Sequence, residues 1–305
     1  MKIAIQHSSG DPKWVSGILH PKAVTRWARA AEESGFDALG FTDHPAPSSR
    51  WINSGGEGVC DPFTALGFCA AVTERIKLMT FVAVAGYRNP LMFAQQLATL
   101  DVLSDGRVIA GLGTGYLKSE FHALGVDPNR RTELLDEAIE VMRLGWSGAE
   151  ITMDTKTFSA NQAMVRPPTI QGVDIPIWIH ANSKWGTERA VKHAQGWMGM
   201  IMDPERTRTV RTPAIVDFDH MGRRIAELDE ECEKHGRDRS TLEVIVNGMW
   251  GWLDIRDGLD IPRMREEMEL LESMGVDWVV GLATGADVGA AEDTVRALGE
   301  GLKSN

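Results

Sequence analysis

The chain has 305 residues, of which 43% are hydrophobic and 25% charged, the composition of an ordinary soluble globular protein. Its formal net charge of −11 argues against nucleic acid or an anionic membrane as the main partner, because both require a basic surface. Three cysteines without a CxxC pattern predict reduced thiols in a cytoplasmic protein with no metal cluster, and no apolar run is long enough to span a bilayer.

Apolar strand-like runs alternate with amphipathic helical segments along the chain. The expected strands lie at residues 2–7, 38–44, 76–85, 107–110, 175–180, 196–201, 242–251 and 277–282. The expected helices lie near residues 21–34, 62–73, 90–104, 130–146, 184–195, 221–232, 264–271 and 291–302. Eight such repeats favour a (β/α)8 TIM barrel, built as a single domain from residues 1–305, over a doubly wound sheet.

Two segments depart from this alternation. Residues 149–168 change to a period of two, with Ile151, Met153 and Thr155 on one face, which predicts a β-hairpin inserted between the fourth and fifth strands. Residues 203–217 are polar and contain two prolines, which predicts a loop.

A glycine loop, Gly-Leu-Gly-Thr-Gly-Tyr at 111–116, follows the fourth strand. Because Tyr116 stands where the dinucleotide motif requires glycine, a Rossmann site is disfavoured. Two interpretations stay open. The glycines allow a tight turn of the backbone, or they allow the backbone to approach a flat ligand.

The C-terminal ends of the strands form the active face of a barrel. The candidates there include His7, His44 beside Asp43, the pair Asn182-Ser183, and Trp250. His44 is either a proton donor or a structural histidine, and Ser183 either caps a helix or helps its N–H groups bind a phosphate. The set is poor in metal ligands, so no metal site is expected. Its apolar and aromatic groups suit a planar organic cofactor.

The motif NPxxxAQQxATLDxLSxGR at 89–107, followed by GxGxG at 111–115, resembles the bacterial luciferase-like family. Thr42-Asp43-His44 and Glu120-Phe121 strengthen a closer resemblance to its branch of deazaflavin-dependent oxidoreductases, which use coenzyme F420. The resemblance implies a barrel, often a homodimer, with the flavin or deazaflavin at the C-terminal face.

The resemblance also implies roles for individual residues. His44 matches the acid of the family's sugar-phosphate dehydrogenases, and a non-prolyl cis peptide is implied near Thr80-Phe81. Contacts to the cofactor, including those of the phosphate-binding turn after the fifth strand, are implied for Asp43, Ala83, Thr114, Gly115, Ser119, Asn182, Ser183, Trp185 and Gly186.

Some positions depart from that pattern. Tyr116 takes the place of a catalytic glutamate, and Met200 and Asp203 stand where those dehydrogenases bind the substrate phosphate. A small neutral or hydrophobic organic substrate is therefore expected, with hydride transfer to or from F420 and with His44 and Tyr116 as catalytic residues. The alternatives are an FMN-dependent monooxygenase that uses O2 and a non-catalytic cofactor-binding protein.

Overall fold

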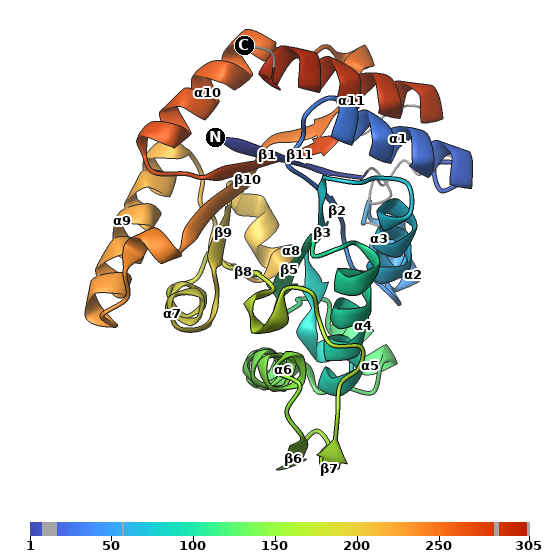
Figure 1. Cartoon of the computed structure of the whole chain (residues 1–305). Coiled ribbons are helices and arrows are strands. Elements are labelled where there is room, and N and C mark those ends of the chain that lie inside the picture. Colours follow the sequence, from blue (N-terminus) through green and yellow to red (C-terminus); the bar gives the residue numbers. More distant parts are fainter. Residues whose placement is uncertain (8–16, 57, 284–286, 304–305) are drawn as a thin grey trace.

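A closed sheet of parallel strands runs through the molecule, and helices cover its outside (Figure 1). The structure, a computed structural model, describes residues 1–7, 17–56, 58–283 and 287–303. The strand order is β3, β2, β1, β11, β10, β9, β8, β5 and β4, and pairing of β3 with β5 closes the ring. Since β3 and β4 are two halves of one barrel strand, the described residues form eight strand positions, and the predicted (β/α)8 barrel is confirmed.

The elements alternate along the chain as predicted. The barrel strands are β1 (Lys2–Gln6), β2 (Ala38–Phe41), β3 (Lys77–Thr80), β4 (Ala83–Val84), β5 (Val108–Gly113), β8 (Ile177–His180), β9 (Gly196–Met200), β10 (Glu243–Leu253) and β11 (Trp278–Ala283). The helices are α1 (Pro21–Glu33), α2 (Ser49–Asn53), α3 (Pro62–Ala70), α4 (Pro90–Leu103), α5 (Lys118–Ala123), α6 (Arg131–Trp146), α7 (Lys184–His193), α8 (Thr207–Val210), α9 (Phe218–Lys234), α10 (Ile261–Ser273) and α11 (Val288–Lys303).

The predicted hairpin is present and consists of β6 (Ile151–Asp154) and β7 (Ser159–Ala163), which pair antiparallel. It extends away from the barrel beyond α6 (Figure 1). Its turn is fastened to the barrel by Thr157, whose hydroxyl hydrogen-bonds to Arg130 and to Glu137 at 3.0 Å each.

Two predictions about local structure were wrong in detail. The run at 76–85 is not one continuous strand, because it breaks at a cis peptide between Phe81 and Val82, one bond after the expected position. The segment at 203–217 is not all loop, since the 3-10 helix η5 (Pro204–Arg206) and α8 occupy its first half. Asp203 starts η5 by accepting a hydrogen bond from the N–H of Glu205 at 2.8 Å.

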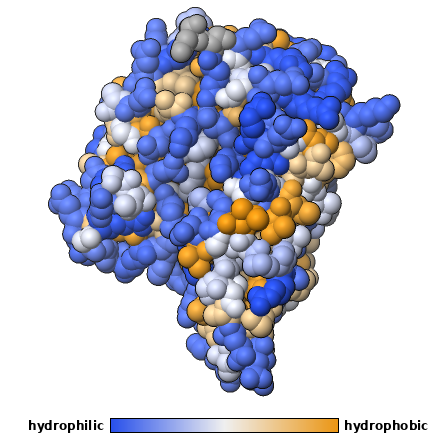
Figure 2. Space-filling model, in the orientation of Figure 1, coloured by the Kyte–Doolittle hydropathy of each residue, from blue (hydrophilic) through white to orange (hydrophobic). Residues whose placement is uncertain are grey.

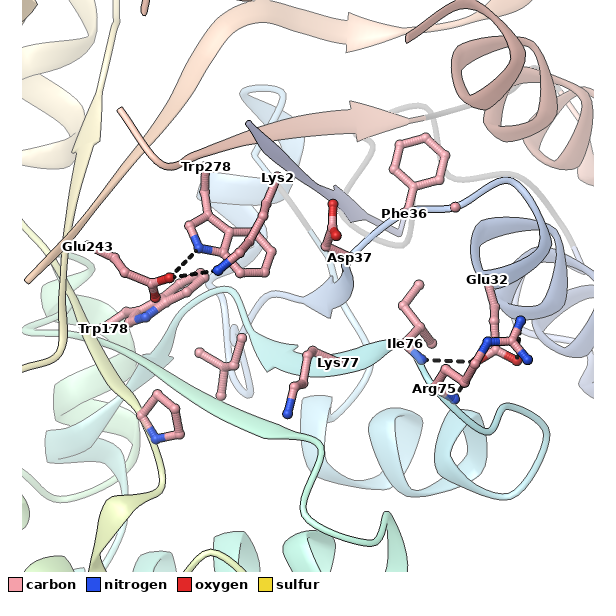
Figure 3. Close-up of a pocket in the computed structure, with 13 residues that line it drawn as sticks. Lys2, Glu32, Phe36, Asp37, Arg75, Ile76, Lys77, Trp178, Glu243 and Trp278 are labelled. Carbon is pink, nitrogen blue, oxygen red and sulfur yellow. Dashed lines mark hydrogen bonds and ion pairs between the residues drawn. The ribbon is translucent and has the colours of Figure 1, made fainter. Parts of the chain in front are cut away.

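The lumen of the barrel has its own apolar core, separate from the one between sheet and helices. At the N-terminal end of the strands, Trp178 and Trp278 form a floor, with ring centroids 4.9 Å apart and planes at 68°. A cavity of about 510 Å³ lies beside this floor, lined by residues that include Glu243, Trp278 and Lys2 (Figure 3). Glu243 accepts hydrogen bonds from Trp278 Nε1 and Lys2 Nζ, both at 3.0 Å. The N-terminal end of such a barrel serves stability, while chemistry takes place at the opposite mouth.

The face of the molecule seen in Figure 2 is mainly hydrophilic, with hydrophobic side chains confined to small separate areas. Within the described ranges, no helix has the length and apolar character needed to cross a membrane.

Candidate active site

Uncharged residues form the last layer of the lumen before the mouth at the C-terminal end of the barrel. Side chains alternate across a strand, so a residue two positions beyond a lumen residue also faces the lumen. This rule places six residues in the last layer before the mouth: Gln6, Gly40, His180, Met200, Asn247 and Leu282. Burial lowers the pKa of His180 to about 4, so its ring is neutral at pH 7. The layer therefore suits a flat, uncharged molecule.

A buried carboxylate holds the histidine that follows β2. Glu120, in α5, is fully buried, and its Oε2 lies 2.9 Å from Nδ1 of His44. The same oxygen accepts a hydrogen bond from the Tyr87 hydroxyl at 2.9 Å, and Oε1 accepts one from the N–H of Ala46 at 3.2 Å. Burial and the Glu120 carboxylate raise the pKa of Tyr87 well above its usual range, so its hydroxyl keeps its proton.

Aromatic rings form a wall on the other side of His44. The Tyr116 hydroxyl lies 3.3 Å from Nε2 of His44, and the two ring centroids are 5.7 Å apart. Trp51, in α2, completes the wall with its ring 5.9 Å from that of Tyr116 and 6.3 Å from that of His44. The two predicted catalytic residues are thus brought together, in a setting that combines a proton-exchanging ring with apolar surfaces.

The carboxylate of the neighbouring Asp43 is occupied by hydrogen bonds within the protein. Its carboxylate accepts hydrogen bonds from the N–H of Val84 at 3.0 Å and from both terminal nitrogens of Arg88, at 2.5 and 2.8 Å. The Arg88 guanidinium in turn lies 4.8 Å from the ring centroid of Phe63, which holds it in place. Asp43 therefore anchors the start of β4 beside the mouth, and direct contact of its side chain with a cofactor stays a prediction.

The glycine loop fits against the broken strand of its own barrel. A Cβ at Gly111 would lie 2.0 Å from the carbonyl oxygen of Thr80, and one at Gly113 would lie 2.9 Å from Cγ2 of Val82. Gly115 adopts a φ of +74°, which favours glycine at this turn. Both sequence-based interpretations of this loop thus omitted a contact, because Gly111 and Gly113 make room for the chain segment at 80–82 between β3 and β4.

Several residues with a predicted cofactor role lie at the same end of the barrel. Ala83 is buried in β4 and pairs with Leu112 of β5, while Thr114 and Ser119 are half-buried in the segment that leads from β5 into α5. Whether these residues contact a cofactor stays a prediction.

The turn from β8 into α7 is tightly folded. A Cβ at Gly186 would lie 2.2 Å from Cβ of Ala181, so this close approach requires glycine. Ser183 caps α7 by accepting a hydrogen bond from the N–H of Gly186 at 3.2 Å. The side chain of Asn182 is committed to backbone, donating to the carbonyls of Met200 at 2.7 Å and Pro213 at 3.0 Å.

The first N–H groups of α7 are available to a ligand. Ser183 occupies the N–H groups of Gly186 and Thr187, whereas those of Lys184 and Trp185 have no partner within the described residues. The Trp185 side chain is 76% exposed. Free N–H groups at a helix start, beside a lysine, form a setting that attracts a phosphate. The helix cap formed by Ser183 is therefore compatible with a phosphate site at the N–H groups of Lys184 and Trp185.

Three other side chains, those of His7, Trp250 and Cys69, are held by packing, hydrogen bonding or burial that indicates a structural role. His7 packs in the outer core with its ring centroid 4.7 Å from Trp27 and 4.8 Å from Phe41, and burial lowers its pKa to about 3. Trp250 donates a hydrogen bond to Glu267 at 2.8 Å. Burial raises the pKa of the Cys69 thiol to about 12, which leaves it unreactive at neutral pH.

Sequence reasoning missed the role of Glu120, and it did not name Tyr87 or Trp51 as part of the site. Glu120 was noted in the motif Glu120-Phe121, but its partner His44 lies 76 residues earlier in the chain. A glutamate four residues beyond a glycine loop that ends a barrel strand is the available signal, because α5 places it against His44 and Ala46, which follow the end of β2.

Comparisons with known proteins agree with this architecture. An uncharacterised protein of Mycobacterium tuberculosis (strain ATCC 25618 / H37Rv) is 33% identical over 214 residues, which are 63% of this chain and 68% of that protein. The F420-dependent glucose-6-phosphate dehydrogenase of Microbacterium testaceum (strain StLB037) is 30% identical over 231 residues, 74% of this chain and 63% of that enzyme.

The same fold occurs in a monooxygenase, RslO1 from Streptomyces bottropensis, whose crystal structure matches with a TM-score of 0.79 at 19% identity over 99% of both chains. The family model for luciferase-like monooxygenases matches residues 1–252. The chain therefore belongs to the luciferase-like monooxygenase family.

Proposed function

We propose that this protein transfers a hydride between coenzyme F420 and a small, neutral or hydrophobic organic substrate. The main observation in support of this proposal is that Nε2 of His44 and the hydroxyl of Tyr116 lie 3.3 Å apart beside the ring of Trp51. When a hydride leaves or joins a carbon that bears oxygen, a proton must leave or join that oxygen, and histidine suits this transfer near neutral pH. The 30% identical F420-dependent relative supports the choice of cofactor.

The residues at the mouth fit the two ends of such a cofactor. The uncharged layer that contains Gln6, His180 and Asn247 suits a flat ring system, and the N–H groups of Lys184 and Trp185 suit a phosphate. The ring, when bound, accepts or gives the hydride. The further contacts that we propose for the cofactor come from Asp43, Ala83, Thr114, Gly115, Ser119, Asn182, Ser183 and Gly186.

The chain's own residues would manage the proton. When an alcohol is oxidised, its carbon gives up a hydride and its hydroxyl gives a proton to Nε2 of His44. When a carbonyl compound is reduced, Nε2 returns that proton. The Tyr116 hydroxyl can hydrogen-bond to the same substrate oxygen.

The groups around the site support an uncharged substrate. Tyr116 replaces a carboxylate with a neutral phenol, and Met200 is an uncharged member of the last lumen layer. Asp203 carries a negative charge and already caps η5. None of these three groups attracts a phosphorylated molecule by charge.

The first test is a fluorescence titration of the purified protein with F420 and, in parallel, with FMN. Tight binding of F420 and weak binding of FMN is the expected result. The reverse preference would overturn the proposal in favour of an FMN-dependent monooxygenase, which oxygen uptake would then reveal. Binding of F420 without turnover of any compound in a panel of alcohols and ketones would indicate a cofactor-binding protein instead.

Substitution of the histidine tests the assigned chemistry. His44→Ala should lower kcat by about 10²–10⁴-fold, the usual value of general acid–base catalysis, and leave F420 affinity nearly unchanged. His122→Ala, which removes an exposed histidine of α5, is the matched control and should behave like the unmodified protein. Unchanged kcat in His44→Ala would rule out this role for His44.

A further inference from the structure

We propose that Glu120 is the positioning residue of this site: together with Tyr87 it fixes His44 in the tautomer that carries its proton on Nδ1, and so makes Nε2 the nitrogen that exchanges a proton with the substrate. The tautomer follows from contacts within the chain. Its consequence for turnover rests on the proposed hydride transfer.

The contacts of the carboxylate select this tautomer. Nδ1 of His44 lies 2.9 Å from Oε2 of Glu120, a distance that requires a proton between them. In the other tautomer, the lone pair of Nδ1 would face a buried carboxylate oxygen, and both groups would lose a hydrogen bond that no water could replace. A neutral imidazole with its proton on Nδ1 presents a lone pair on Nε2.

The second nitrogen faces the side where a substrate would bind. Nε2 lies 3.3 Å from the Tyr116 hydroxyl, beside the ring of Trp51. In the resting enzyme the lone pair of Nε2 can accept the Tyr116 proton, and a substrate hydroxyl can take its place. The proton released in an oxidation therefore has one defined acceptor.

Other groups keep the carboxylate itself from rotating. The Tyr87 hydroxyl donates to Oε2 at 2.9 Å and the N–H of Ala46 donates to Oε1 at 3.2 Å, so each oxygen is held. The Tyr87 ring packs edge-on against Phe121, at 4.9 Å between centroids, in a small apolar cluster of its own. Three donors around one carboxyl group are suited to its ionised form.

This geometry also lets Glu120 act on proton transfer by His44 without taking part in cofactor binding. When His44 takes up a proton, the Glu120 carboxylate on the opposite nitrogen stabilises the resulting cation, as the buried aspartate does in a serine-protease triad. Glu120 itself lies behind His44 and away from the aromatic wall. Its loss should therefore lower kcat and leave cofactor affinity unchanged.

The test reads the tautomer directly, in the absence of cofactor and substrate. Protein labelled with ¹⁵N-histidine is studied by long-range ¹H–¹⁵N correlation spectroscopy, and the His44 signals are identified by their loss in His44→Ala. We expect a protonated Nδ1 and an unprotonated Nε2. Glu120→Gln should introduce a population with the proton on Nε2, and Tyr87→Phe should introduce a smaller one.

Glu231→Gln is the matched control, because Glu231 is a buried carboxylate of α9 that hydrogen-bonds to His235 at 2.9 Å. It should alter the signals of His235 and leave those of His44 unchanged. A proton on Nε2 of His44 in the unmodified protein, or a His44 pattern that neither Glu120→Gln nor Tyr87→Phe changes, would overturn the proposal. Tyr87→Phe keeps the test decisive where Glu120→Gln does not fold.

The kinetic arm applies once a substrate is found. Glu120→Gln should lower kcat by about 10²-fold, the lower end of what acid–base catalysis contributes, with F420 affinity unchanged. Glu120→Asp, which restores the carboxylate, should recover part of the loss. An unchanged kcat would overturn the catalytic half of the proposal. A protein that shows the expected tautomer but binds no F420 would instead refute the proposed function and leave the positioning role intact.

Discussion

At the scale of single residues, the histidines that follow β1 and β2 illustrate how the surroundings decide what a histidine can do. His7 directly follows β1 and lies against Trp27 and Phe41, where burial lowers its pKa to about 3. Such a ring stays neutral throughout the physiological range and cannot exchange protons there. His44, by contrast, has a carboxylate on one nitrogen and a hydroxyl near the other, which are the partners that proton exchange requires.

The burial of His7 predicts an acid-dependent loss of stability. The unfolded chain protonates this histidine near pH 6.5 and the folded protein only near pH 3, so the unfolded state binds more protons between these values. The free energy of unfolding should therefore fall as the pH falls, by about 2 kcal/mol from this group between pH 7 and pH 5. Urea unfolding of His7→Gln should show a smaller fall by about that amount. His122→Gln, which removes an exposed histidine, should keep the full fall, and equal pH dependence in all three proteins would contradict the prediction.

At the scale of elements, two glycines of β5 are required by the close approach of the neighbouring, broken strand. β3 stops at Thr80 and β4 resumes at Ala83, and the chain between them presses toward Gly111 and Gly113. The restart also places the N–H of Val84 on the carboxylate of Asp43 at 3.0 Å. The broken strand thus links the glycine loop to the residues that follow β2.

This contact makes Gly111 sensitive to substitution. Gly111→Ala would place Cβ 2.0 Å from the carbonyl oxygen of Thr80, which is backbone and cannot move aside cheaply. We expect a loss of about 3 kcal/mol in the free energy of unfolding, the upper range for overpacking. Gly67→Ala, in α3 with nothing within 4 Å of its Cβ, is the matched control and should be neutral or stabilising by up to about 1 kcal/mol. Similar urea midpoints for the two variants would show that β3 accommodates the methyl group.

At the scale of the whole molecule, the barrel separates stability from chemistry along its axis. The floor holds Trp178, which is fully buried, whereas the mouth carries Trp185 with 76% of its surface exposed. Trp178→Ala should therefore cost about 3–5 kcal/mol of unfolding free energy and leave F420 affinity unchanged while the protein is folded. Trp185→Ala should change stability by less than about 0.5 kcal/mol and weaken F420 binding by about tenfold, equal to roughly 1.4 kcal/mol. Urea unfolding and fluorescence titration of both variants measure the two effects, and a loss of affinity in Trp178→Ala alone would contradict this separation.

Much of this architecture could be predicted from the sequence, because its signals are local. Asn89-Pro90 predicts the start of α4, where Asn89 indeed accepts a hydrogen bond from Leu91, and the period of two predicts the hairpin. The break in the run at 76–85 has no signal in residue propensities, since its residues are all compatible with one strand, and only the family resemblance indicated an irregularity near Thr80-Phe81. Short helices in a polar segment, such as α8, are equally hard to predict because one turn has almost no pattern.

The site was only partly predictable for a different reason. His44 and Tyr116 stand out because each follows a strand end or a motif, but what holds them is set by packing between distant segments. The partner of Asp43 is Arg88, 45 residues later, and the partner of His44 is Glu120, 76 residues later. Such pairings become visible only when the barrel brings the ends of its strands together.

The two indoles of the floor have a spectroscopic consequence. Trp178 and Trp278 belong to β8 and β11, and their rings lie 4.9 Å apart at 68°. Two indoles this close couple electronically, and we expect the pair to contribute a paired band of opposite signs to the ultraviolet circular dichroism. Because the band requires both strands to be in place, it monitors the bottom of the barrel without a label, independently of what occupies the mouth.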